Sequence, residues 1–159
     1  MKPLDEPSLD LIGRWKFPDH KFVCEKLVLL KQTNLIGNTY FSNYIEWQGE
    51  ARERLLLSHP ATEGFLKQNP HIKLITHSLY HRFLQDTSLA DTIRIELTTR
   101  EILDYSLVIV FRYNNTKTNA FIGEGWQKIC FFDTRLKRLC PVPQFILDLA
   151  EPIREDPQK

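Results

Sequence analysis

One long helical pattern precedes a series of strand-like segments, and this order limits the folds open to the chain. The strand-like segments, rich in β-branched and aromatic residues, are Ile72 to Gln85, Thr92 to Arg100, Ile102 to Tyr113 and Ala120 to Asp133. The apolar run from Phe22 to Lys31 predicts a further strand ahead of the helix. Five strands around one segregated helix predict an α+β fold, in which an antiparallel sheet packs on that helix.

The helical pattern begins near Tyr40 and ends before Pro60, because the residue preceding a proline avoids helical geometry. Wound at about 100° per residue, one face collects Phe41, Tyr44, Ile45, Gln48, Ala51, Arg52 and Leu55. The opposite face, which the pattern predicts to be solvated, holds Ser42, Asn43, Glu46, Glu50 and Glu53. Gln48 and Arg52 are therefore polar residues in an apolar face. A buried guanidinium is costly unless it is paired or hydrogen-bonded. Arg52 is thus expected to serve either a structural network or a functional site, and the helix pattern leaves both open.

Length and charge exclude several classes of protein. A chain of 159 residues suits one domain with a sizeable core. Its net charge is +1, whereas a nucleic-acid partner would require a basic stripe. Neither a membrane span nor a signal peptide is expected, because no apolar run is long enough and the N-terminal sequence is acidic and polar. The three cysteines, Cys24, Cys130 and Cys140, have no framework spacing, so we expect reduced thiols in a cytoplasmic protein.

Three segments are expected along the chain, because prolines and charged residues dominate both ends. They are an N-terminal arm of residues 1–20, a main domain of residues 21–150 and a loose tail of residues 151–159. No metal and no cofactor are expected. His77 and His81 would point to the same side of one strand, but two histidines without a third ligand seldom hold a metal ion. Cys130 has no neighbouring histidine and is expected to be a buried thiol.

A glycine turn and the helix after it carry the longest motif of the chain. The sequence TNLIGNTYFSNYIEWQGEARE, from Thr33 to Glu53, resembles the pattern TNLxGNxYFxNYxxWQGxxRE of the enediyne polyketide thioesterases. That group is a branch of the 4-hydroxybenzoyl-CoA thioesterase family. Two supporting matches are Leu89-Ala90-Asp91 and the segment from Gly123 to Asp133. The resemblance extends from about Phe22 to Pro143. It implies the hotdog fold, in which a five-stranded antiparallel sheet wraps around one long helix.

The resemblance also implies which residues form the site. Asn34 occupies the position of the family's catalytic aspartate. In the enediyne branch this asparagine and the helix arginine, Arg52 here, are taken as catalytic. The backbone N–H of Phe41, or that of Tyr40, is expected to meet the thioester oxygen, because a helix N-terminus offers free N–H groups. The residues expected to bind substrate are Tyr44, Tyr40, Gly37 and Gln48. Since Asn34 is neither a nucleophile nor a strong base, the expected mechanism is electrostatic catalysis of water attack.

These observations predict a thioester hydrolase acting on an acyl group, with a polyketide or polyene chain on acyl carrier protein as the expected substrate. One alternative is an aryl- or fatty acyl-CoA thioesterase, for which Arg135, Lys137 and Arg138 could bind the CoA phosphates. Another is a non-catalytic acyl-binding hotdog module, which the missing aspartate keeps open. We expect a homodimer with two equivalent sites at its interface, with a dimer of dimers, a homotetramer, as the alternative.

Overall fold

The structure, a computed structural model, describes residues 18–155. The strands are β1 (Phe22–Leu27), β2 (Ile72–Phe83), β3 (Thr92–Arg100), β4 (Ser106–Asn115), β5 (Phe121–Asp133) and β6 (Arg138–Cys140). The α-helices are α1 (Ser42–Leu57), α2 (Ala61–Gln68) and α3 (Gln144–Ala150). Short 3-10 turns occupy Pro18–His20, Leu30–Gln32 and Glu151–Ile153. None of the helices within residues 18–155 has the length and apolar character needed to cross a membrane.

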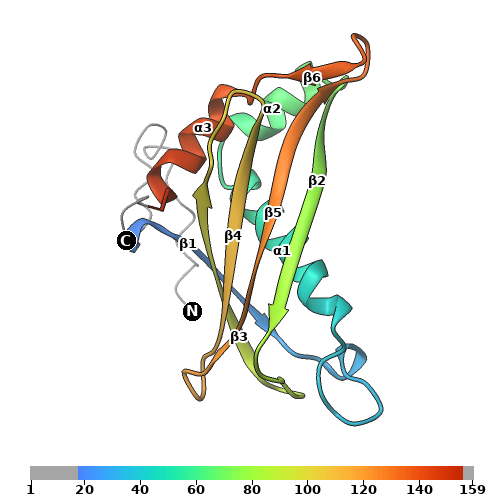
Figure 1. Ribbon diagram of the computed structural model, residues 1–159, viewed down its shortest axis with the longest axis vertical. Coiled ribbons are helices and arrows are strands. Elements are labelled where there is room, and N and C mark those ends of the chain that lie inside the picture. The colour runs from blue at the N-terminus through green and yellow to red at the C-terminus, as the bar shows by residue number, and fades with distance from the viewer. Residues whose placement is uncertain (1–17, 156–159) are drawn as a thin grey trace, which may run out of the picture.

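The sheet is antiparallel throughout and curls around α1 (Figure 1). Its strand order is β1-β3-β4-β5-β2, and the short β6 pairs with the end of β5. Strands β1 and β2, which flank α1 in the sequence, therefore lie at opposite edges of the sheet. This arrangement confirms the expected α+β hotdog fold.

Alternation along the central strands supplies the core. Ile93, Ile95 and Leu97 on β3 are fully buried, while the residues between them are only half-buried. These three side chains belong to the same core cluster as Trp47 of α1, which is also fully buried. Burial of such side chains is the main favourable term in folding. The inner face of the sheet is thus closed by α1, and residues of α3 join the same core cluster.

Two strands, β1 and β4, differ most from their sequence-based limits. The first ends at Leu27 instead of Lys31, because the chain turns at Leu30–Gln32, where the side-chain oxygen of Gln32 accepts a hydrogen bond from the amide of Leu29. The strand expected from Ile102 begins only at Ser106. The residues before it form the tight link between β3 and β4, closed by a hydrogen bond from the Leu103 amide to the Ser106 carbonyl oxygen.

The chain end also differs from its expectation. Residues from Glu151 onward were expected to form a loose tail, yet Ile153 is fully buried and Arg154 bridges to Thr99 of β3. Glu155 accepts hydrogen bonds from Thr98 and Arg112. Apolar burial and the ion pair between Arg112 and Glu155 therefore hold this segment. It lies beside the last residues of β3, beyond the part of that strand that pairs with β1. Residues 1–17 of the expected arm and residues 156–159 lie outside the described residues.

Candidate active site

Arg52 lies on the inner side of α1 and reaches both β2 and β5. Its Nη1 donates hydrogen bonds to Thr76 Oγ1 and to Gln127 Oε1, each over 2.8 Å. The residue is half-buried, and burial lowers the pKa of its guanidinium. A guanidinium still keeps its charge at neutral pH. Within residues 18–155 no carboxylate forms an ion pair with Arg52, so neutral partners hold this charge in place.

Among residues 18–155, the other edge of the Arg52 guanidinium has no hydrogen-bond partner. Its Nε is buried and makes no hydrogen bond, and Nη2 makes none within the described part of the chain. The Nε and Nη2 groups are the pair that binds a carboxylate or another oxygen anion with two parallel hydrogen bonds. An orphaned, charged donor in a buried position is costly. The edge is therefore suited to an acceptor oxygen supplied by a ligand.

A chain of two glutamines fixes the orientation of this arginine. Gln127 accepts from Arg52 and donates through Nε2 to Gln48 Oε1 over 3.2 Å. Gln48, which is fully buried, donates through Nε2 to the carbonyl oxygen of Tyr80 and to Nδ1 of His81, each over 3.2 Å. Each amide oxygen and nitrogen thereby has a defined partner. Gln48 supports Gln127, the residue that holds Arg52, and its expected role in substrate binding stays a prediction.

His81 ends this chain, and its part in the site was not foreseen. Burial lowers its pKa to about 4, so the imidazole is neutral at pH 7. Because Nδ1 accepts from Gln48, the ring proton lies on Nε2, which is buried and has no hydrogen-bond partner in the described part of the chain. The ring packs against Tyr44, Phe83 and Tyr113 at centroid distances of 5.4, 4.4 and 5.0 Å respectively. The strand alternation alone could not identify it, because the register shift between Thr76 and Ser78 decides which later residues of β2 face α1.

Glycines in β5 leave the space that these polar side chains occupy. A Cβ placed on Gly125 would lie 2.2 Å from Gln48 Nε2 and 2.4 Å from the carbonyl oxygen of Tyr80. A Cβ on Gly123 would lie 3.3 Å from His81 Nε2. The sequence match that begins at Gly123 therefore corresponds to close approach between α1, β2 and β5.

Tyr44, expected to line the site, lies in the core with 3% of its surface exposed. Its hydroxyl makes a 2.8 Å hydrogen bond with Thr87 Oγ1, which in turn contacts Thr39 Oγ1 over 2.7 Å. Its carbonyl oxygen accepts from the hydroxyl of Tyr113. These contacts tie the start of α1 to the loop before β3 and to β4. The substrate-binding role of Tyr44 stays a prediction.

A tight turn precedes α1 and holds Asn34 and Gly37. Asn34 Oδ1 accepts from the amide of Ile36 over 3.0 Å, and the Gly37 amide donates to the Asn34 carbonyl oxygen over 3.0 Å. Gly37 has a φ of 89°, and nothing lies within 4 Å of a Cβ built on it. Glycine is therefore needed here for its backbone angle and not for a close contact.

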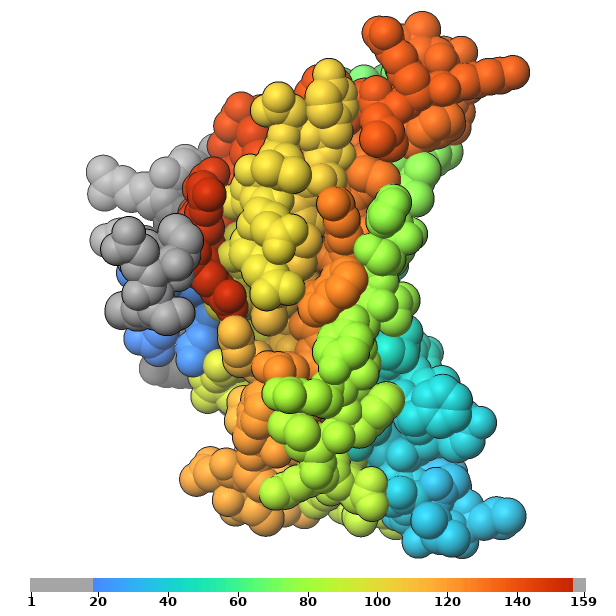
Figure 2. Space-filling model, in the orientation of Figure 1, coloured from blue at the N-terminus to red at the C-terminus, as the bar shows by residue number. Residues whose placement is uncertain are grey.

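The two amides expected as oxyanion donors differ in their availability. The Tyr40 amide donates to the carbonyl oxygen of Gln32 over 2.8 Å, whereas the Phe41 amide has no hydrogen-bond partner within residues 18–155. Phe41 was expected on the buried helix face, but it precedes α1 and is 57% exposed. The segment of residues 33–41 stands out at the lower right of the molecule (Figure 2). Of the two candidates, the free amide is that of Phe41.

Within one chain the structure does not bring Asn34 and Arg52 together. Arg52 lies eleven residues beyond Phe41, which corresponds to about 16 Å along a helix axis. Asn34 lines a shallow surface hollow with Leu30, Tyr40 and their neighbours, whereas the partners of Arg52 are on β2 and β5. The expected catalytic residues thus form two groups. Asn34 and Phe41 precede the start of α1, whereas Arg52 lies within the helix and faces β2 and β5.

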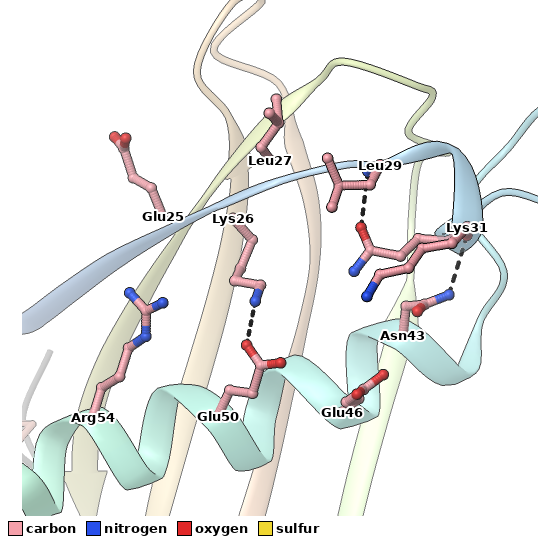
Figure 3. A pocket seen from close by; sticks show the side chains of 10 residues that line it. Glu25, Lys26, Leu27, Leu29, Lys31, Asn43, Glu46, Glu50 and Arg54 are labelled. Atoms are coloured by element: carbon pink, nitrogen blue, oxygen red, sulfur yellow. Dashed lines mark hydrogen bonds and ion pairs between the residues drawn. The ribbon is translucent and has the colours of Figure 1, made fainter.

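A charged groove between β1 and α1 contains none of the expected site residues (Figure 3). It has a volume of about 430 Å³ and three basic and three acidic side chains: Lys26, Lys31, Arg54, Glu25, Glu46 and Glu50. Lys26 forms an ion pair with Glu50 across it. The acidic residues of the outer helix face are thus partly paired, and their balanced charge gives the groove no preference for an anion.

The two histidines of β2 do not form a metal site. A register shift between Thr76 and Ser78 interrupts the strand alternation at His77. His77 is exposed and contacts Ser78, whereas His81 lies under α1. Within residues 18–155 no group of three histidine, cysteine or acidic side chains is arranged to hold a metal ion.

Solved structures share this fold. The dynemicin thioesterase, described for polyene binding, superposes with a TM-score of 0.79 at 21% identity, over 86% of this chain and 99% of its own. A 1,4-dihydroxy-2-naphthoyl-CoA thioesterase from Synechocystis gives a TM-score of 0.74 at 17% identity, over 81% and 94% of the two chains. A gentisyl-coenzyme A thioesterase gives 0.68 at 22% identity, over 80% and 98%. At these identities the likeness establishes the fold alone.

The sequence itself provides the assignment. No curated protein sequence gives a significant match. Residues 28–149, which span the region from the end of β1 to α3, match the family described as the thioesterase-like superfamily. The match includes the glycine turn, α1 and the strands that hold Arg52. The chain belongs to the thioesterase-like superfamily.

Proposed function

We propose that the protein hydrolyses acyl thioesters and that the free Nε–Nη2 edge of Arg52 stabilises the oxyanion. A water oxygen adds to the carbonyl carbon, the C–S bond breaks, and the thiolate leaves and takes up a proton. Negative charge develops on the carbonyl oxygen during this attack. The observation that carries the proposal is a permanent cation, held by Thr76 and Gln127, whose remaining donors face no protein acceptor within the described residues. One such donor typically contributes about 3–4 kcal/mol to a transition state.

Replacing Arg52 by lysine tests this role. Lysine keeps the charge but lacks the planar fork, so Arg52→Lys should lower kcat/KM on the order of 100-fold or more. The matched control is Arg54→Lys, because Arg54 is on the same helix but faces the charged groove. Wild-type kinetics in a folded Arg52→Lys protein would exclude the proposed role. If the unchanged protein binds acyl groups without any turnover, it is an acyl-binding module.

Asn34 and the Phe41 amide belong to the same reaction only if a second chain contributes them. We propose a homodimer in which the turn of one protomer meets the Arg52 site of its partner. The separation of the two groups within one chain and the exposure of the turn support this. Asn34 would then hold the attacking water or the carbonyl, as its amide allows.

Mixing two inactive variants tests the shared site. Asn34→Ala and Arg52→Ala chains, unfolded together and refolded as an equal mixture, should form heterodimers with one site carrying both changes and one intact site. About a quarter of wild-type activity should return, since half of the dimers are mixed. Each variant alone should stay inactive after the same treatment. No recovery in a mixture proven to contain heterodimers would exclude a site that combines Asn34 of one protomer with Arg52 of the other.

For the acyl carrier, we propose a polyketide or polyene chain on acyl carrier protein, with CoA thioesters as the second candidate. The fold likeness to the dynemicin thioesterase favours the first, and the two CoA thioesterases favour the second. Arg135 and Lys137 are exposed in the turn between β5 and β6, and Arg138 is exposed at the start of β6, where the three could bind CoA phosphates. Hydrolysis rates of one acyl group on both carriers distinguish the two. Lys137→Glu should raise KM for the CoA thioester if this hairpin binds its phosphates.

A further inference from the structure

An apolar cavity of about 300 Å³ lies where α1, α2, α3, β2 and β5 meet. Its walls include Leu56, Phe65, Leu74, Phe131, Phe145 and Ile146. Figure 1 shows α2 and α3 at the end of the sheet toward which α1 runs. An engineered apolar cavity of about 150 Å³ is sufficient to bind benzene. The cavity described here has twice that volume, which corresponds to an apolar group on the order of twelve carbon atoms.

The cavity adjoins the Arg52 site through all three elements that build that site. Leu56 follows Arg52 by one helical turn on α1, about 6 Å away. On β2, Leu74 precedes Thr76 by two residues on the same face, about 7 Å along the strand. On β5, Gln127, Ile129 and Phe131 follow one another at every second residue on the inner face. Phe131 of the cavity is therefore next to Ile129, which is next to Gln127 of the Arg52 site.

We propose that this cavity binds the apolar end of an acyl chain whose carbonyl oxygen lies at Arg52. The inference rests on the proposed thioesterase function and adds a limit on the substrate, a straight or aromatic acyl group on the order of twelve carbon atoms. Among the described residues that line the cavity, Glu53 alone is charged. A carboxylate here repels an anionic chain end, so the preferred acyl group is uncharged at its far end. Phe145 and Ile146 of helix α3 form part of the cavity wall.

Binding of the reaction product tests the site without turnover. Saturated fatty acids from octanoate to hexadecanoate carry the carboxylate for Arg52 and the chain for the cavity. By isothermal titration calorimetry, affinity should rise about fourfold per methylene up to on the order of twelve carbons, then level off. Hydrolysis of the matching acyl thioesters should follow the same order of chain length.

Two lining variants should move this limit in opposite directions. Leu66, on α2, is 53% exposed at the cavity edge, so Leu66→Trp adds bulk with little risk to folding. It should weaken binding of dodecanoate at least tenfold and leave octanoate within threefold. Phe145→Ala should shift the limit to longer acids. The matched control is Leu103→Trp, since Leu103 is 56% exposed in the β3–β4 link and should leave all affinities unchanged.

The outcomes separate the two proposals. Equal chain-length profiles for wild type, Leu66→Trp and Phe145→Ala, with melting curves that prove folding, would overturn the cavity assignment. Absence of any fatty-acid binding would overturn it as well. If the acids bind in the predicted order but no thioester is hydrolysed, the cavity assignment stands and the proposed thioesterase activity fails.

Discussion

Gln127 has both ends of its amide engaged, the oxygen with Arg52 and the nitrogen with Gln48. A glutamine here holds the guanidinium without neutralising it. A carboxylate at the same position would form an ion pair and remove the positive potential that an oxyanion needs. At the scale of the residue, the chemistry of the site thus depends on a neutral partner for a charged side chain.

Gln127→Glu should therefore lower kcat/KM and give the loss a pH dependence. Arg52 favours the ionised form of the new carboxylate, so its pKa should be low and the defect should shrink only as the pH falls toward acid values. The measurement is kcat/KM of wild type and of Gln127→Glu as a function of pH, expressed as the ratio of the two values. Gln85→Glu is the control, because Gln85 is exposed in the loop after β2. A ratio that is constant across pH would contradict the proposed electrostatic role.

His81 should make stability depend on pH. Its pKa of about 4 in the folded protein is below the value of about 6.5 for a free histidine. Between these values the unfolded chain binds more protons, so the free energy of unfolding should fall as pH falls from about 6.5 to about 4. It should level off below that range. Denaturant titrations of wild type and His81→Gln measure the effect.

In His81→Gln this acid-dependent loss should shrink, whereas His77→Gln should keep it. His77 is exposed on the same strand and provides the matched comparison. An identical pH dependence in wild type and His81→Gln would assign the loss to other groups.

The residues of the site were predictable to different degrees. Arg52 stands out in the sequence because a charged residue interrupts an apolar helix face. Its partners do not, since Thr76 and Gln127 are 24 and 75 residues away. Their approach depends on the pairing of β2 with β5, including the register shift at His77, and the alternation of side chains along β2 does not reveal that shift. Asn34 and Arg52 were expected in one site at a dimer interface, and their separation within one chain leaves that expectation a prediction.

At the scale of the element, close contact between α1 and β5 determines which residues the strand tolerates. Gly125 faces Gln48 and the Tyr80 carbonyl oxygen, and no side chain fits there without displacing them. Gly64, in α2, has open space around it, because nothing lies within 4 Å of the place that a Cβ would take. Two glycines in regular elements therefore differ in their reason for being glycine.

Gly125→Ala should lower the free energy of unfolding by about 1–3 kcal/mol, because the added methyl group overfills the contact. Gly64→Ala should raise it by up to about 1 kcal/mol, since alanine is the better helix former. Denaturant titration of the two variants against wild type measures both effects. Equal stability of the two variants would show that β5 moves away from α1 without cost.

Element types were predictable where periodicity was strong. The alternation of Ile93, Ile95 and Leu97 in β3 and the helix face of α1 both gave the correct element. The predicted start of β4 was wrong, because the turn between β3 and β4 decides where that strand begins. The prediction that residues 151–155 are loose was also wrong, because a long-range bridge to Thr99 holds them. Both depend on contacts that the local side-chain pattern does not contain.

At the scale of the molecule, β2 is an edge strand of twelve residues with exposed apolar side chains. Ile75, Leu79 and Phe83 are 37%, 45% and 49% exposed. Unpaired backbone groups and apolar side chains on one edge favour association with another strand. We therefore expect the proposed dimer to use β2.

Light scattering coupled to size exclusion should give a dimer, or a dimer of dimers, at micromolar concentration. Leu79→Lys should shift the protein toward the monomer by placing a charge in the expected interface. Leu27→Lys is the control on the opposite edge strand, where Leu27 is 52% exposed. A wild-type protein that is monomeric at this concentration would contradict both the proposed dimer and the proposed shared site.

The unpaired charge of Arg52 links ligand binding at the site to the free energy of unfolding. A cation half-buried among neutral groups raises the free energy of the empty folded state, and an anion at its free edge relieves that cost. By mass action, any ligand that binds only the folded chain shifts the unfolding equilibrium. The melting temperature should then rise with carboxylate concentration and, in Arg52→Lys, respond less. Stability alone thus becomes a reporter of which anions the protein recognises.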